Sequence, residues 1–356
     1  MAILRDNIHY STRKIDGYNL PFNFVISERE LGKSTTIILD KIYKPFKERG
    51  ETTIVIRRMV NHISEDYVED FANIINKFTD DNVIFQYSKN ALKDGIVTIK
   101  VDGKPFIRFI GLSKQIASIK SMMFPNLQAI VFDEFICNGR FGEKYLKDEA
   151  TKFLEVYNTF RRESKNLKCW FLGNPYSLFT PYFSYFNVDS SKLVRGAIVS
   201  DKVQYVVECA EMCEELRAKI LKENPLYKFD NAYTRYAFNG VNVNDENIIV
   251  DTIRPSNYSL KFVFKIDGKF IAVWRNNKYE DLAGFRYYVD NIAPEVVSSK
   301  RNIYCFDFDE MQDRTIMLSI DERYKFDNMR KAMRERKIAF HSIECYYLFE
   351  EIYMNL

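Results

Sequence analysis

An apolar run that leads through a glycine-lysine-serine loop into a helical stretch constrains the fold of this chain more than any other feature. Residues 22–27 (FNFVIS) are apolar, and the loop SERELGKST follows before the helical spacing begins. This is the strand, loop and helix order of a nucleotide-binding unit. In such units backbone amides and a lysine hold the phosphates, and a hydroxyl holds Mg²⁺. Gly32, Lys33, Ser34 and Thr35 are therefore predicted to bind ATP, together with Ser27 at the start of the loop, and Ser34 is also predicted to be a ligand of Mg²⁺.

The loop departs from the usual pattern at its first glycine, where this chain has Ser27. Serine adopts a positive φ angle reluctantly, whereas glycine does so freely. The backbone geometry of the loop around Ser27 is therefore left open by the sequence. The alternative interpretation is a chance glycine-lysine-serine at the start of a helix.

A second apolar run, LQAIVFDEF at 127–135, ends in two adjacent carboxylates. A strand of this kind brings its last residues beside the phosphate loop. Asp133 is predicted to hold Mg²⁺ through water, and Glu134 to act as the general base for an attacking water molecule. The alternative is an ordinary strand that ends at an acidic turn.

Two further residues lie in order behind these carboxylates. Asn174 follows the apolar run of WFLGNP, where its amide suits a sensor of the γ-phosphate, although an Asn-Pro turn explains it equally. Arg161 lies late in a predicted helix, from which an exposed arginine could reach a nucleotide on a neighbouring subunit. Cations also favour helix C-termini for electrostatic reasons alone.

Apolar runs alternate with amphipathic stretches through about residue 200, which predicts an α/β domain with a largely parallel sheet at 1–200. Its other predicted elements are strands at 52–58 and 167–175, a hairpin at 96–111, and helices at 65–78 and 147–164. Residues 201–255 are predicted to form a helical linker with a helix at 206–223. Residues 256–356 predict a smaller α+β domain, with strands at 259–275, 284–290 and 301–309 and helices at 325–337 and 346–355.

The composition bounds the class of protein. Hydrophobic residues make up 46% and charged residues 28% of the chain, as in a soluble globular protein. No uncharged apolar run reaches the length of about eighteen residues that a membrane span needs, and no signal peptide is visible, so a cytosolic protein without membrane contact is expected. The six cysteines include no C-x-x-C pair, and Cys209 and Cys213 are interpreted as two buried thiols. Because the net charge is only +3, any contact with DNA must be local.

Taken in order, these motifs resemble the DNA-packaging ATPases, or encapsidation proteins, of phi29-like phages, small relatives of the terminase large subunits in the additional-strand P-loop class. The resemblance is carried by segments at 23–34, 54–58, 112–136, 158–163, 172–187 and 260–264. It implies a ring of ATPase subunits, usually a homopentamer, that docks on the portal of a procapsid and drives double-stranded DNA inward. It also implies a protein of the host cytoplasm that visits the portal vertex and is absent from the mature virion, and an RNA adaptor is a further candidate partner.

The resemblance also implies roles for single residues. Lys33 and Ser34 match the phosphate and Mg²⁺ positions, and Asp133 and Glu134 match the metal-binding and catalytic carboxylates. The remaining matches are Arg29 as the arginine of the P-loop, Asn174 as the coupling position, Arg161 as an arginine finger offered in trans, and Lys120 as a second basic group near the intersubunit site.

One further departure concerns the grip on DNA. Relatives carry a lysine soon after the double arginine, where this chain has Val60, Asn61 and His62. The DNA-gripping side chains therefore cannot be copied over. Arg57 and Arg58 remain candidates for DNA binding, with a structural salt bridge as the alternative for each.

The second domain is expected to resemble ribonuclease H, as the nuclease domain of terminases does, but without cleavage. A nuclease of this type needs several carboxylates that converge on metal ions, and the first strand of the domain, LKFVFKI, has none in its middle. Asp267 belongs to a hairpin turn, which leaves Asp307, Asp309 and Glu310 as a local acidic cluster. The basic stretch at 330–337 is either a contact for DNA, RNA or the portal, or a solvated helix face.

Three alternatives to a packaging motor stay open at this stage. The chain could be a helicase-like or DNA-repair ATPase without a capsid. It could be a non-catalytic nucleotide-binding assembly module, an alternative that Ser27 leaves open. It could also be an active nuclease joined to an ATPase.

Overall fold

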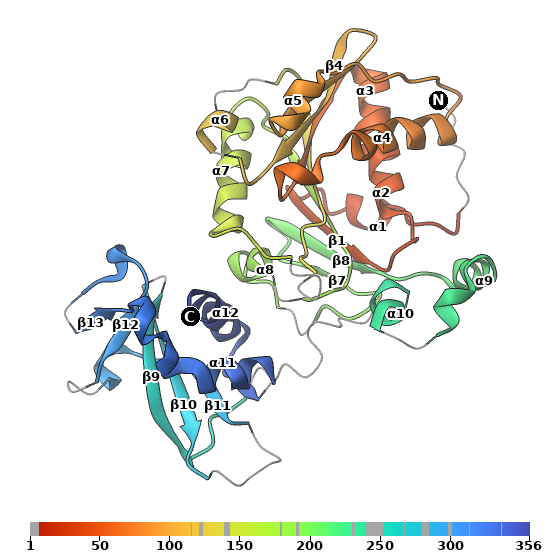
Figure 1. Ribbon diagram of the computed structural model, residues 1–356. Helices are drawn as coiled ribbons and strands as arrows, with labels where there is room; N and C mark the ends of the chain where they lie inside the picture. Colours follow the sequence, from red (N-terminus) through yellow and green to blue (C-terminus); the bar gives the residue numbers. More distant parts are fainter. Residues whose placement is uncertain are drawn as a thin grey trace. The chain divides into compact units, whose positions relative to one another are not determined.

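In the computed structural model the chain forms two compact units, Met1–Asn244 and Asp245–Leu356 (Figure 1). The structure describes residues 7–114, 116–120, 124–138, 143–178, 180–189, 192–229, 232–238, 252–266, 268–278, 285–297, 301–312, 314–335 and 337–356. Among these residues, no helix is long and apolar enough to cross a membrane.

An eight-stranded sheet forms the centre of the first unit, in the order β3-β4-β2-β5-β6-β1-β8-β7. The strands are β1 (Phe22–Ser27), β2 (Thr52–Arg57), β3 (Ile96–Val101), β4 (Lys104–Gly111), β5 (Leu127–Asp133), β6 (Lys168–Gly173), β7 (Ile198–Ser200) and β8 (Tyr205–Ala210). The six inner strands are parallel, and the edge strands β3 and β7 pair antiparallel with β4 and β8. The prediction of a mostly parallel sheet is confirmed, and β6 is inserted between β1 and β5.

Helices cover both faces of this sheet (Figure 1). They are α1 (Arg13–Asp16), α2 (Lys33–Thr36), α3 (Lys44–Arg49), α4 (Glu65–Phe78), α5 (Lys89–Lys93), α6 (Ile116–Lys120), α7 (Glu149–Arg161), α8 (Pro181–Tyr185), α9 (Glu214–Glu223) and α10 (Ala232–Ala237), with 3₁₀ turns at Val60–His62 and Pro225–Lys228. A π-helical segment, Ile37–Tyr43, joins α2 to α3 just before Pro45. Proline removes a hydrogen bond and crowds the preceding turn, which a π segment relieves.

Aromatic side chains fix α4 and α7 on opposite faces of the sheet. On one face Phe71 of α4 meets Phe109 of β4, with ring centroids 5.1 Å apart. On the other face Phe153 of α7 packs 4.7 Å from Phe171 of β6 and 5.8 Å from Phe132 of β5. The alternation of side chains along each strand places Phe109 and Phe132 on different faces. Large apolar rings therefore seat α7 directly on the central strands.

The predicted helix at 206–223 is wrong over its first part. Residues Tyr205–Ala210 form β8, which is buried throughout and pairs with β1 on one side and with the edge strand β7 on the other, and α9 begins only at Glu214. A buried parallel strand is a continuous apolar run, and such a run cannot be told from a buried helix by periodicity. The predicted linker 201–255 thus contributes a strand to the first unit. Cys209 is buried in β8, whereas Cys213 is exposed, so the prediction of two buried thiols fails for Cys213.

The second unit has a six-stranded sheet in the order β13-β12-β9-β10-β11-β14. Its elements are β9 (Tyr258–Ile266), β10 (Lys269–Asn276), β11 (Tyr287–Asn291), β12 (Ile303–Cys305), β13 (Thr315–Met317), β14 (Ile338–Phe340), α11 (Asp327–Arg334) and α12 (Ile343–Asn355), with 3₁₀ turns at Pro294–Val296, Phe308–Glu310 and Ile320–Phe326. The predicted hairpin is confirmed as β9 and β10, and Gly268 in its turn has a φ angle of 70°. Asp267 lies outside the described residues. The two short strands β13 and β14 were not predicted.

Candidate nucleotide site

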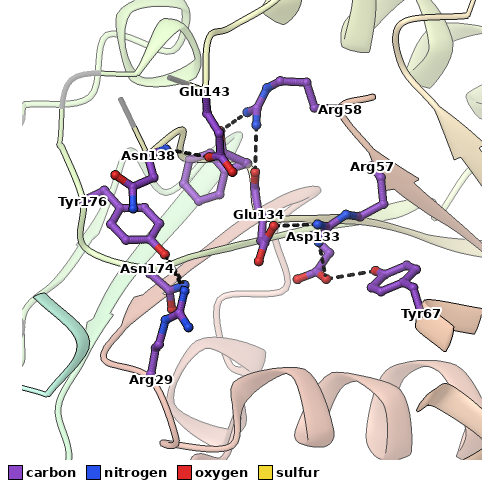
Figure 2. Close-up of polar contacts among 11 residues, drawn as sticks. Arg29, Arg57, Arg58, Tyr67, Asp133, Glu134, Asn138, Glu143, Asn174 and Tyr176 are labelled. Carbon is purple, nitrogen blue, oxygen red and sulfur yellow. Dashed lines mark hydrogen bonds and ion pairs between the residues drawn. The ribbon is translucent and has the colours of Figure 1, made fainter. Parts of the chain in front are cut away.

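Three neighbouring strands end at the same edge of the sheet of the first unit. β5, β6 and β1 are adjacent and parallel, so the segments that follow their carboxyl ends are brought together. These segments carry the acidic pair, Asn174 and the phosphate loop. Along the chain, Asn174 follows Glu134 by 40 residues and Lys33 by 141 residues. The topology therefore assembles the residues that the sequence singled out separately (Figure 2).

The loop between β1 and α2 has the backbone of an anion-binding turn. Gly32 is the N-cap of α2 with a φ angle of 89°, and a Cβ atom there would lie 3.3 Å from Cδ2 of His9. Only glycine takes this conformation without strain. Ser27 is the last, buried residue of β1, and the residues of positive φ in the loop are Glu30 and Gly32. Serine in place of the first glycine therefore sits in extended backbone and imposes no left-handed conformation.

Lys33 is held over the loop by two acceptors. Its Nζ donates to Oδ1 of Asn174 at 2.6 Å and to the carbonyl oxygen of Ser27 at 3.5 Å. Burial lowers the pKa of Lys33 to about 8, against the opposing effect of Asp133 and Glu134. The ammonium is thus directed at the end of β6, and the carboxylates at the end of β5 favour its charged form.

Asn174 and Arg29 are linked through a residue that the sequence analysis missed. Tyr176 accepts a hydrogen bond from Nη2 of Arg29 at 2.9 Å and one from Nδ2 of Asn174 at 3.4 Å (Figure 2). Asn174 is 8% exposed, and the turn that the sequence also predicted follows it directly at Pro175 and Tyr176. The chain of contacts from Lys33 through Asn174 and Tyr176 to Arg29 connects the two basic residues of the loop.

Asp133 and Glu134 are both paired with Arg57 (Figure 2). Nη1 of Arg57 lies 2.9 Å from Oδ2 of Asp133, and Nη2 lies 2.5 Å from Oε2 of Glu134. Tyr67 of α4 donates to the same Oδ2 of Asp133 at 2.9 Å, and the guanidinium of Arg57 stacks over the Tyr67 ring. Burial and the neighbouring Asp133 raise the pKa of Tyr67 well above its usual value, which keeps the hydroxyl protonated as a donor.

The two arginines that were candidates for DNA binding both make internal ion pairs. Arg57 and Arg58 are 9% and 4% exposed. Arg58 forms two hydrogen bonds with Glu149 on α7, from Nε at 2.7 Å and from Nη2 at 3.0 Å. Of the two interpretations that the sequence left open, the structure shows the salt bridge for each residue.

Arg161 makes none of the contacts described for this cluster. Arg161 is the last residue of α7 and is exposed. Lys120 ends α6, which packs beside α7, and its side chain lies outside the described part of the structure. An exposed position at a helix end leaves Arg161 accessible to another molecule.

The loop is also anchored to a segment that the sequence did not connect with it. Glu28 is buried, with Oε1 lying 2.9 Å from Nη2 of Arg195 and 3.6 Å from Nη2 of Arg217. The amide of Arg29 donates to the carbonyl oxygen of Ala237 at 2.8 Å, and Glu30 accepts from the Tyr227 hydroxyl at 2.6 Å. No local pattern signals these contacts, because the partners follow the loop by more than 160 residues.

The residues present fit a nucleotide with Mg²⁺. Ser34 stands in the first turn of α2 beside Lys33, and Asp133 ends β5, which is separated from β1 by β6 alone. Within the described ranges, no group of three or more histidine, cysteine, aspartate or glutamate side chains could hold a metal ion. Mg²⁺ in nucleotide sites is held by one or two protein ligands together with the phosphates, so a site of Ser34 and Asp133 matches that chemistry.

In the second unit the acidic cluster is joined to a buried lysine. Lys265 of β9 is 4% exposed, and its Nζ lies 3.3 Å from Oε2 of Glu310 and donates to the carbonyl oxygen of Glu310 at 3.1 Å. Asp307 and Asp309 are exposed. The first strand of this unit therefore carries a cation near its end, beside the acidic turn.

Comparison with known proteins extends over nearly the whole chain. The family model described as podovirus DNA encapsidation protein (Gp16) matches residues 4–355. The DNA packaging protein of Bacillus phage PZA is 26% identical over 316 residues, which cover 88% of this chain and 87% of the relative. The DNA packaging protein of Bacillus phage phi29 is 25% identical with the same coverage.

Two solved structures share the fold. The chain aligned from the phi29 genome packaging motor assembly has a TM-score of 0.64 at 23% identity, and the alignment covers 98% of this chain and 99% of that one. The phi28 gp11 DNA packaging motor has a TM-score of 0.58 at 15% identity, with 95% of each chain covered. Both units of the fold are thus shared with these proteins. With a match over residues 4–355, the chain belongs to the podovirus DNA encapsidation protein family.

Proposed function

We propose that this chain is the ATP-hydrolysing subunit of a motor that drives double-stranded DNA into a procapsid. The observation that carries the proposal is the convergence of Lys33, Asn174 and the Asp133-Glu134 pair at adjacent strand ends. The relatives that match over most of the chain are DNA packaging proteins. This family match favours a packaging motor over a helicase-like or DNA-repair ATPase.

Each residue of the site has one task in the proposed reaction. Lys33 and the amides around Gly32 hold the phosphates, with Arg29 beside them, while Ser27 supports the loop and Thr35 extends it along α2. Ser34 and Asp133 hold Mg²⁺, which supplies Lewis-acid stabilisation of the phosphate oxygens. Glu134 accepts the proton of the attacking water. Asn174 passes the state of the phosphate from Lys33 to Tyr176.

The contacts in the structure indicate what must change before catalysis. Lys33 donates to Asn174, and Glu134 is paired with Arg57. Lys33 therefore exchanges Asn174 for a phosphate, and Glu134 leaves Arg57 to reach water. Because both carboxylates share Arg57, movement of that one side chain alters the metal ligand and the base together.

The finer fold assignments are part of this proposal. A strand inserted between the phosphate-loop strand and the carboxylate strand is the arrangement of the additional-strand P-loop class, and β6 supports it. In the second unit the order β11-β10-β9-β12-β13, antiparallel over the first three strands and parallel beyond, supports a ribonuclease-H-like domain. Lys265 beside Glu310 supports the view that this domain does not cleave DNA.

The partners follow from the same family. We propose a homo-oligomeric ring, a pentamer in the simplest case, that holds double-stranded DNA, docks on the portal and uses an RNA adaptor. Arg161, and Lys120 with it, acts on the nucleotide of the next subunit. The protein works in the host cytoplasm and at the portal vertex, and leaves before the virion matures.

The direct test is ATP turnover by Glu134→Gln, measured as phosphate release with and without duplex DNA. The variant is expected to bind ATP normally and to lose turnover by a factor of about 100 or more, since a positioned general base contributes about 10²–10⁴-fold. Glu48→Gln, at an exposed glutamate near the end of α3, is the matched control and should turn over ATP normally. Normal turnover by Glu134→Gln would rule out its role. Absence of turnover in the wild-type protein would favour a nucleotide-binding assembly module.

A further inference from the structure

We propose that Arg58 is a positioning residue for ATP hydrolysis, which fixes the backbone turn of Glu134 and ties that turn to α7, the helix that carries Arg161. The inference rests on the proposed function, because it assigns a role relative to Glu134 and Arg161. It concerns neither a phosphate contact nor a DNA contact. Arg58 acts entirely through other residues.

The turn after β5 has an unfavourable backbone that Arg58 holds in place. Glu134 has a φ angle of 59°, in the left-handed region that residues other than glycine rarely adopt. Nη1 of Arg58 donates to the carbonyl oxygen of Glu134 at 3.2 Å, and Nη2 donates to that of Phe135 at 2.6 Å. A single guanidinium therefore binds two consecutive carbonyl groups on the carboxyl side of the strained residue. This fixes the direction in which the Glu134 side chain leaves the backbone.

The same guanidinium binds the first residue of α7 on its other side. Glu149 is 1% exposed and accepts from Nε and Nη2 of Arg58, from the hydroxyl of Tyr182 at 3.0 Å and from the amide of Leu146 at 2.8 Å. The carboxylate is thus fully engaged by four donors from three segments of the chain. A buried pair of this kind, with each group satisfied, is well suited to fix geometry.

The other end of α7 carries Arg161. The helix runs over thirteen residues, Glu149–Arg161, which is about 20 Å, and Phe153 locks it onto Phe132 and Phe171 of the sheet. The catalytic turn, Arg58, Glu149 and α7 therefore form one continuous packed body. A change in the Glu134 turn of one subunit would shift the arginine that the same subunit offers to the next.

The first test is Arg58→Lys, which keeps the positive charge but cannot reproduce the forked set of four hydrogen bonds. We expect kcat for ATP to fall by about 10- to 100-fold, the effect of a displaced catalytic group, with KM for ATP within about twofold of wild type because the phosphate loop is untouched. Arg108→Lys is the matched control, because Arg108 is a half-buried arginine of β4 that binds Thr98 and stacks on Phe124. It should keep normal kcat.

Glu149→Gln is the second variant, and it decides the outcome if Arg58→Lys does not fold. It keeps the shape of the side chain but removes the charge, and it should lower kcat in the same way. A merely structural role would lower the melting temperature of either variant and leave kcat at the wild-type value. Normal kcat in a folded variant would overturn the proposal. A wild-type protein without turnover would instead overturn the proposed function itself.

The link to α7 has its own readout in mixed assemblies. When Arg58→Lys subunits are added to wild-type subunits, ATP turnover should fall more steeply than the wild-type fraction, because a shifted Arg161 also impairs the neighbouring wild-type site. Glu48→Gln subunits, mixed in the same way, should leave turnover unchanged. A decline in proportion to the wild-type fraction would show that Arg58 serves only its own subunit and would overturn the link.

Discussion

Two opposing effects act on the pKa of Lys33. Burial lowers its pKa to about 8, while the carboxylates of Asp133 and Glu134 favour the charged form. A lysine of this kind is charged at neutral pH only by a small margin. The ammonium that donates to Asn174 and to the carbonyl oxygen of Ser27 can therefore lose its proton at mildly alkaline pH.

The affinity for ATP should depend on pH through this lysine. As pH rises through 8, Lys33 without nucleotide loses its proton, and ATP phosphates bind the protonated form. The dissociation constant should therefore increase above pH 8, approaching about tenfold per pH unit. Calorimetry between pH 6.5 and 9.5 measures this, and Lys33→Arg, which stays charged, should remove the dependence. A flat wild-type profile would contradict the assignment of the buried ammonium to the phosphates.

Gly173 should be intolerant of a methyl group. A Cβ atom there would lie 2.8 Å from Cε1 of Phe135 and 2.9 Å from Ile136, on the turn that follows Glu134. Gly173→Ala is expected to cost about 1–3 kcal/mol of unfolding free energy through overpacking and to lower ATP turnover with it. Urea denaturation measures the first effect. Gly17→Ala, where nothing lies within 4 Å, is the control and should be neutral.

At the scale of elements, the strands and helices that carry the site were largely predictable. The apolar runs that lead to Gly32 and Asp133 are each followed by residues typical of loops, which predicts that a strand ends at that point. In the structure these two runs form β1 and β5. β8 could not be recognised, because a fully buried parallel strand lacks the alternation that marks a half-buried one. Its one charged residue, Glu208, accepts a hydrogen bond from a hydroxyl that lies 198 residues away in sequence. No local sequence pattern indicates such a contact.

Glu208 makes the stability of β8 dependent on Tyr10. The Tyr10 hydroxyl donates to Oε2 of Glu208 at 2.8 Å, while burial raises the pKa of Glu208. With a folded-state pKa above the unfolded value, the carboxyl destabilises the fold as it ionises with rising pH. Tyr10→Phe removes a donor to the ionised form, so it should cost about 1–3 kcal/mol, more at pH 8 than at pH 5.

Chemical denaturation at the two pH values measures the effect of Tyr10→Phe, with Tyr18→Phe at an exposed tyrosine as the control. In the Glu208→Gln background the pH dependence of the Tyr10→Phe effect should disappear. An equal loss of stability at both pH values in the Glu208 protein would show that the carboxyl has the same charge at pH 5 and at pH 8, which would contradict its ionisation between them.

At the scale of the whole molecule, the order of the motifs in the sequence predicted which residues form the site. The contacts that hold these residues in place could not be predicted from the sequence. Tyr67, Tyr176 and Glu149 each bind a site residue from a distant segment and belong to no motif. Two adjacent arginines in a sequence are candidates for a DNA contact. Only the structure, in which Arg57 and Arg58 are buried, shows that both form internal ion pairs. The second unit was predicted in outline, while its short strands β13 and β14, of three residues each, fall below what periodicity can detect.

Arg161 should act on the site of another subunit. Arg161→Ala is expected to bind ATP normally and to lose DNA-stimulated turnover, because it removes charge stabilisation that is worth about 10³–10⁵-fold in related enzymes. Mixing it with Glu134→Gln subunits should restore part of the turnover, since each supplies what the other lacks. Arg162→Ala, the exposed neighbour, is the control. No recovery in the mixture would argue against action in trans.

The central claim, that ATP hydrolysis at Lys33 and Glu134 drives DNA into a capsid, is tested most directly by a packaging assay. Procapsids with their portal are supplied with duplex DNA, ATP and this protein, and the DNA that becomes resistant to added nuclease is measured. Wild-type protein should protect DNA only when ATP is present, and Glu134→Gln should protect none, although it binds ATP. Protection by Glu134→Gln equal to that by the wild type would contradict the account.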